Sequence, residues 1–83
     1  MNTITIEIKC YGAFRELGDS FVVEVPQNAN IAELKQKLSN TLKASYQSLI
    51  AESVFADTQQ ILPNHYQLQT TTTLSILPPV CGG

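Results

Sequence analysis

The sequence has little charge, little cysteine and no tryptophan. Among its 83 residues are five Lys or Arg, seven Asp or Glu and two cysteines, for a formal net charge of −2. Because the basic residues are not clustered, we expect no binding to nucleic acid. Cys10 and Cys81 are too few for a disulfide framework and too far apart for a Cys-x-x-Cys site. We therefore expect a reduced, cytoplasmic setting and no metal site.

Long apolar runs are also missing. No stretch approaches the about 20 apolar residues that cross a bilayer, so we expect no membrane span. The N-terminal segment alternates in polarity instead of carrying a basic region before an apolar one, which argues against a signal peptide. The chain is 43% hydrophobic and only 14% charged, a composition typical of a globular protein. Its length allows one small domain with a single core.

Two segments near the start alternate between apolar and polar residues, which predicts two half-buried strands. The apolar faces are Ile4, Ile6, Ile8 and Cys10 in residues 3–10, and Phe21, Val23 and Val25 in residues 20–25. Between them, residues 11–18 (YGAFRELG) predict a short helical turn closed by Gly18. Pro26 is expected to end the second strand, because proline cannot donate to a ladder.

Residues 30–43 have the clearest helix pattern. Asn30 can cap the helix, and Glu33 stands at the position that completes a capping box. One apolar stripe runs along this segment through Ile31, Leu34, Leu38 and Leu42. Further on, the pattern predicts a second short helix over 45–53, short strands within 54–69 and a final strand over 70–77.

This order of elements predicts an α+β fold. Strands at the two ends of the chain and a helix between them are best packed as a mixed sheet against one main helix. If the first and last strands are neighbours, they run parallel, because the connection between them contains the helix. The expected architecture is therefore the β-grasp, or ubiquitin-like, fold. It occupies residues 1–77 and leaves residues 78–83 as an extended tail.

The tail, PPVCGG, has a stiff base and a slim tip. Prolines hold φ near about −65° and favour an extended chain, whereas glycines let another protein's backbone close around them. We expect the tail to enter a narrow channel of a partner through Pro78, Pro79, Val80, Cys81 and Gly82. The chemical group at its tip is the carboxylate of Gly83. A carboxylate is ionised at pH 7 and is a poor electrophile, so it must be activated before it reacts, most simply as a mixed anhydride with AMP.

Nothing in the chain can perform that activation. No phosphate-binding loop, metal constellation or Ser/His/Asp or Cys/His arrangement is visible. We therefore expect no bound cofactor, and we expect the chain to be the substrate of a partner rather than the catalyst.

The ending PPVCGG, together with YGAFRELG at 11–18, resembles the small, sulfur-carrying subunits of molybdopterin synthase, within the ubiquitin-like sulfur carriers. The resemblance implies that Gly83 is adenylated by an E1-like adenylyltransferase that uses ATP, and is then converted to a thiocarboxylate. It further implies that the tail enters the large catalytic subunit, within a heterotetramer, and passes sulfur to cyclic pyranopterin monophosphate. The run Thr70–Thr73 departs from the family, which usually carries an acidic, glycine-containing turn there.

Other readings remain open at this point. The chain could carry sulfur for thiamine or for tRNA thiolation, or it could modify target lysines through Gly83. It could also be a non-covalent interaction module with an idle tail. Cys81 could act as a persulfide relay or as a redox switch with Cys10, or it could be a small tolerated residue. Tyr11 and Leu77 are expected to form an exposed apolar docking patch where the tail emerges, unless a local twist turns them inward.

Overall fold

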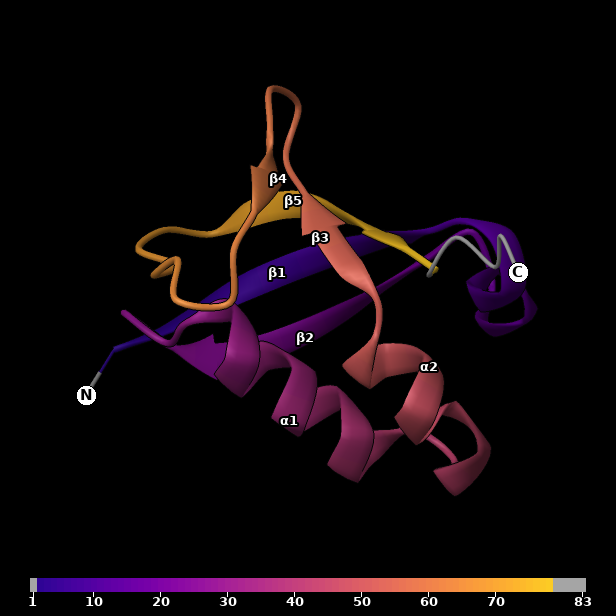
Figure 1. Cartoon of the computed structure of the whole chain (residues 1–83). Helices are drawn as coiled ribbons and strands as arrows, with labels where there is room; N and C mark the ends of the chain where they lie inside the picture. The colour runs from indigo at the N-terminus through magenta and orange to yellow at the C-terminus, as the bar shows by residue number, and fades with distance from the viewer. Residues whose placement is uncertain (1, 79–83) are drawn as a thin grey trace.

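The computed structural model describes residues 2–78. The chain forms a mixed five-stranded sheet of order β2-β1-β5-β3-β4, with α1 and α2 on the same side of it (Figure 1). Short 3-10 helices are written η. The elements are β1 (Thr3–Cys10), η1 (Gly12–Leu17), β2 (Ser20–Pro26), α1 (Ile31–Thr41), η2 (Ala44–Tyr46), α2 (Gln47–Ala51), β3 (Val54–Ala56), β4 (Ile61–Leu62) and β5 (Thr72–Leu77).

The first and last strands are parallel neighbours at the centre of the sheet, as predicted. The register of β1 and β5 runs from Ile6 opposite Thr72 to Cys10 opposite Ile76. The other strand pairs, β1 with β2, β3 with β5 and β3 with β4, are antiparallel. This arrangement confirms the β-grasp fold, in which the two ends of the domain meet side by side.

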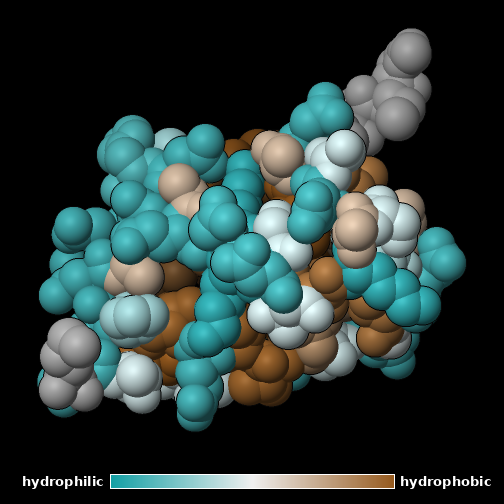
Figure 2. Space-filling model, turned by 90° about the horizontal axis from the view of Figure 1, so that it is seen from below, coloured by the Kyte–Doolittle hydropathy of each residue, from teal (hydrophilic) through white to brown (hydrophobic). Residues whose placement is uncertain are grey.

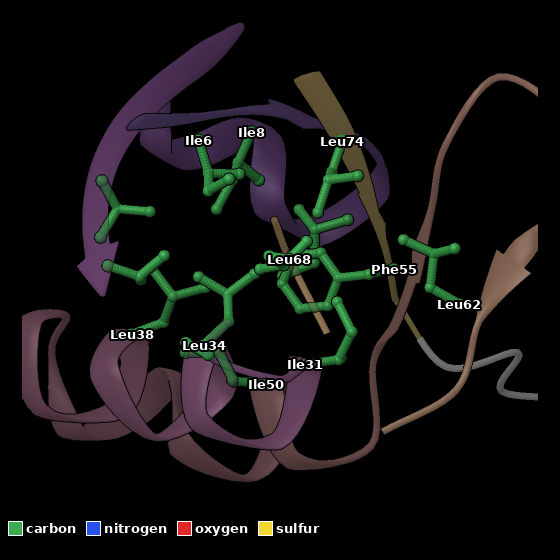
Figure 3. Close-up of a cluster of buried hydrophobic side chains, with 14 of the residues drawn as sticks. Ile6, Ile8, Ile31, Leu34, Leu38, Ile50, Phe55, Leu62, Leu68 and Leu74 are labelled. Atoms are coloured by element: carbon green, nitrogen blue, oxygen red, sulfur yellow. The ribbon is translucent and has the colours of Figure 1, made fainter. Parts of the chain in front are cut away.

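The core lies between the sheet and α1 (Figure 3). Alternation in β1 directs Ile6 and Ile8 into it, and both are fully buried. The stripe on α1 meets them through Leu34 and Leu38, while Phe55 from β3 fills the same interior. Burying one such side chain stabilises the fold by about 1.5–3 kcal/mol. The apolar positions read from the sequence therefore form one core.

The main helix begins as its sequence predicts. The Asn30 side chain accepts a hydrogen bond from the Glu33 backbone N–H at 2.8 Å, and the Glu33 carboxylate accepts from the Asn30 N–H at 2.9 Å. This capping box satisfies two backbone donors that a helix start leaves without partners. The helix ends at Thr41, and Leu42 serves as its C-cap residue.

The second half of the chain is more irregular. The predicted helix at 45–53 forms as η2 followed by α2, and the predicted short strands are β3 and β4. Leu68 is buried in the long loop before β5, where its N–H donates to the carbonyl of Ala29 at 2.8 Å. No helix within residues 2–78 is long and apolar enough to cross a membrane. Seen from below, the surface is mostly hydrophilic, with apolar side chains showing between polar ones (Figure 2).

Candidate functional site

The base of the tail is fixed by the strand that precedes it. β5 lies between β1 and β3, so both of its edges are hydrogen-bonded. Ile76 is opposite Cys10 on one side and Phe55 on the other, and all three side chains are buried. β5 ends at Leu77, and Pro78, half-buried, is the next residue along the chain. The tail therefore starts from a rigid central strand and not from a frayed edge.

The remaining predicted tail residues lie outside the described part of the chain. These are Pro79, Val80, Cys81, Gly82 and the proposed reactive residue Gly83. Their roles in insertion and in chemistry stay predictions.

The two residues of the predicted docking patch lie at the same end of the sheet as the base of the tail. Tyr11 follows the last residue of β1 in an extended conformation, and 44% of its surface is exposed. One step beyond the pairing of Cys10 with Ile76, the parallel register leads to Tyr11 and Leu77. Leu77 is only half-buried. Their role as a docking patch remains a prediction.

The structure adds three apolar residues to this region. Val54 lies opposite Leu77, and Ala56 lies opposite Ile61, so these side chains share the sheet face that points away from the core residue Phe55. Ile61 is 64% exposed. We call Tyr11, Val54, Ala56, Ile61 and Leu77 the outer-face patch. The sequence pattern of any single strand does not predict the outer-face patch, because the patch depends on how four separate segments pair.

A polar network borders the outer-face patch. The Glu7 carboxylate accepts hydrogen bonds from the Thr73 hydroxyl on β5 at 3.2 Å and from the Ser20 hydroxyl on β2 at 3.4 Å. The Thr71 hydroxyl accepts from the Thr5 backbone N–H at 3.1 Å. The threonine run before and at the start of β5 thus ties that strand to β1, which gives a structural role to a segment that departs from the family pattern.

Gly12 is the site residue that the sequence reasoning missed. Its φ is +58°, in the left-handed region that favours glycine. A Cβ atom on Gly12 would stand 2.6 Å from Cγ of Pro78 and 3.3 Å from Cδ. The observed register leads to the same pair: two steps beyond Cys10 and Ile76, the next positions along the two segments are Gly12 and Pro78.

The Cys10 side chain is buried in the core. Only 4% of its surface is exposed, and burial raises the pKa of the thiol, with a smaller contribution from the Asp19 carboxylate in the same direction. A thiol whose pKa is raised is a weak nucleophile at neutral pH, since the thiolate is the reactive form.

The polar side chains Arg15 and His65 both lie on the surface. Arg15 pairs with Asp19 at 3.4 Å, but their side chains are 65% and 95% exposed, so water screens the pair. His65 lies on the exposed loop before β5. Within residues 2–78 there is no group of three or more His, Cys, Asp or Glu that could hold a metal ion.

Fold and site together define a ubiquitin-like β-grasp domain that presents an apolar face beside the base of its C-terminal segment. The chain belongs to the ThiS family, a family of sulfur carriers, and the match covers residues 8–83, including the whole tail. No curated protein sequence matches the chain.

Several solved structures share the fold at low sequence identity. A Haloferax volcanii protein, HVO 2177, is 20% identical with a TM-score of 0.78, over 98% of this chain and 88% of that one. A candidate molybdopterin converting factor, subunit 1, from Pyrococcus furiosus is 17% identical with a TM-score of 0.75, over 93% and 99%. The Caldiarchaeum subterraneum ubiquitin is 16% identical with a TM-score of 0.68, over 99% and 100%. At these identities the likeness concerns the fold alone.

Proposed function

We propose that this chain is the sulfur carrier of molybdenum cofactor biosynthesis and that the sulfur is held as a thiocarboxylate on Gly83. The observation that carries the proposal is the segment PPVCGG, which directly follows the central strand β5 and lies within the family match. The Arg-Glu-Leu run at 15–17 supports the choice of pathway, because the small subunits of molybdopterin synthase resemble this chain there as well.

The proposed chemistry needs two partners. An E1-like adenylyltransferase joins the Gly83 carboxylate to the AMP portion of ATP, and pyrophosphate leaves. Sulfur from a donor then displaces AMP, which gives the thiocarboxylate. The exchange is useful because the thiocarboxylate sulfur is a better nucleophile than a carboxylate oxygen.

The second partner is the large catalytic subunit of molybdopterin synthase. In this proposal it docks on the outer-face patch and receives the tail from Pro78 onward. The thiocarboxylate sulfur bonds to a carbon of cyclic pyranopterin monophosphate and displaces an oxygen substituent, which gives a thioester between carrier and pterin. Hydrolysis of the acyl–sulfur bond leaves the sulfur on the pterin, and two such transfers complete the dithiolene of molybdopterin. Water restores the carboxylate of Gly83. The chain supplies the carrier atom and the docking surface, and its partners supply the catalysis.

The experiment is a sulfur-transfer reaction with the thiocarboxylated chain, the large subunit and cyclic pyranopterin monophosphate. The proposal predicts molybdopterin as the product, detected by mass spectrometry, with one sulfur consumed per chain. Parallel reactions offer the thiamine thiazole system and tRNA as acceptors. Transfer to one of these, with none to cyclic pyranopterin monophosphate, would assign the chain to another sulfur pathway. Formation of lysine adducts instead would make it a protein modifier.

A further inference from the structure

The contact between Gly12 and Pro78 joins the first turn of the molecule to the last described residue. Gly12 opens η1, which follows β1, and Pro78 follows β5. Because a Cβ on Gly12 would lie 2.6 Å from Cγ of Pro78, the proline ring occupies the space that any side chain at position 12 would need. Carbon atoms in contact normally stand about 3.5–4.0 Å apart, so the two groups could not coexist without movement.

The ring of Pro78 has little room to move away on its own. A change of ring pucker moves Cγ, but Cδ is bonded to the backbone nitrogen of residue 78. Cδ, at 3.3 Å from the added Cβ, therefore shifts only when that backbone shifts. A flexible side chain at the same place would simply rotate. The contact therefore constrains the backbone at the point where the tail begins.

Both sides of the contact are held by the fold. η1 is anchored by Phe14, which is fully buried and whose N–H donates to the Tyr11 carbonyl at 3.1 Å. At its far end, the N–H of Gly18 donates to the Arg15 carbonyl at 3.0 Å. On the other side, Leu77 is paired with Val54 in the sheet. Because η1 is anchored and Pro78 lies one residue beyond the last paired residue of β5, a side chain at Gly12 would displace Pro78 and not η1.

We propose that Gly12 is a positioning residue for sulfur transfer: its missing side chain lets Pro78 sit against η1, and this contact sets the point and direction from which the tail enters a partner. The inference rests on the proposed function of Gly83. In this proposal Gly12 acts through Pro78.

Gly18 provides a control for backbone strain. Its φ of +113° and ψ of −174° lie in a region that is essentially confined to glycine, so alanine is strained there at least as much as at Gly12. A Cβ at Gly18, however, would meet only the Ser20 carbonyl oxygen at 3.9 Å, an ordinary contact. Both alanine variants therefore carry backbone strain, and only Gly12→Ala collides with Pro78.

The test compares Gly12→Ala, Gly18→Ala, Pro78→Ala and the double variant Gly12→Ala/Pro78→Ala in the full chain. The activating adenylyltransferase is supplied with ATP and sulfide, and thiocarboxylate formation is followed by intact mass to give kcat and KM for the chain. NMR of the free chain, through the proton contacts between residues 12 and 78, reports the position of Pro78 independently. Urea unfolding measures the cost to stability of each variant.

We expect Gly12→Ala to lower kcat by about tenfold or more, since small misplacements of a reacting group have large kinetic effects. KM should change little because the substitution leaves the rest of the folded domain unchanged, and the 12–78 contacts should be lost. Gly18→Ala should keep kcat within about twofold, although it should lower stability at least as much as Gly12→Ala does. In the Pro78→Ala background, where Cγ and Cδ are absent, Gly12→Ala should have a much smaller effect on kcat.

Equal losses of kcat in Gly12→Ala and Gly18→Ala would overturn the inference, as would an unchanged kcat in Gly12→Ala. The inference would also be overturned if Gly12→Ala lowered kcat as much in the Pro78→Ala background as it does in the wild-type chain. If the wild-type chain itself acquires no sulfur, that result contradicts the proposed function, and the proposed role of Gly12 falls with it. Sulfur acquired normally by both the wild-type chain and Gly12→Ala would contradict only the role of Gly12.

Discussion

Cys10 and Ile76 form the last residue pair of the parallel ladder between β1 and β5, and both side chains are buried in the core. This pair joins two segments from opposite ends of the chain immediately before the tail begins. The strand that precedes the tail is therefore part of the core of the domain.

The first prediction concerns this strand. Ile76→Ala should lower the free energy of unfolding by about 2–5 kcal/mol, because it leaves a cavity among fully buried side chains. Ser75→Ala is the control, since Ser75 is only half-buried and belongs to the opposite face of the same strand. Its effect should stay within about 0.5 kcal/mol in urea unfolding. Equal effects of the two substitutions would contradict the facing assigned to β5.

The second prediction concerns the Cys10 thiol, whose pKa the fold raises by burial and by the nearby Asp19 carboxylate. The unfolded thiol, with its ordinary pKa of about 8.5, ionises at lower pH than the folded one. Stability should therefore be unaffected by this group below about pH 8, and should fall as the pH rises through the folded pKa. Measured in a Cys81→Ser background, this alkaline loss should be smaller in Cys10→Ala than with Cys10 present.

The same background offers a direct check on reactivity. With Cys81→Ser, Cys10 is the only cysteine. A thiol reagent at neutral pH should label it slowly in the native chain and completely in denaturant. Rapid native labelling would show that Cys10 is accessible and would reopen its role as a redox partner of Cys81.

The third prediction concerns the outer-face patch. Tyr11→Ser should weaken binding to the large subunit, measured by calorimetry, because Tyr11 is an exposed aromatic side chain beside the base of the tail. Tyr66→Ser is the matched control, since Tyr66 is a comparably exposed tyrosine, at 38%, on the loop before β5. We expect a loss of about tenfold or more in affinity for the first, and little change for the second. A loss of the same size in both would argue against the patch.

Local patterns were enough to predict the elements that pack against the core. The alternation of β1, the apolar stripe of α1 and the capping box at Asn30 and Glu33 are periodic or short-range signals, and each forms as expected. β3 and β4 have only three and two residues, so their bounds follow from pairing with β5 and with each other, which no local pattern encodes.

The sequence predicted only the part of the candidate site that depends on the first and last strands being parallel neighbours. Placing the first and last strands side by side was enough to bring Tyr11 near Leu77. The role of Gly12 needed one further step, together with its positive φ and the position of the Pro78 ring, which only the three-dimensional structure provides. The contribution of β3 and β4 to the outer-face patch could not be predicted either, because it depends on strand pairing that only the structure provides.

The fourth prediction separates the tail from the fold. Deleting Gly83 should abolish sulfur transfer and leave urea unfolding unchanged, because the family match includes a tail that lies beyond the last strand. A truncated chain that unfolds, or one that still supports molybdopterin formation, would refute this assignment of the tail.

The most direct test of the central claim is the intact mass of the chain after incubation with the activating adenylyltransferase, ATP and sulfide. The account predicts that one oxygen is replaced by one sulfur, and that fragmentation places the change on Gly83. It also predicts no change without ATP or in the chain that lacks Gly83. An unaltered mass in the presence of an enzyme that adenylates other carriers, or a sulfur found on Cys81 instead, would contradict it.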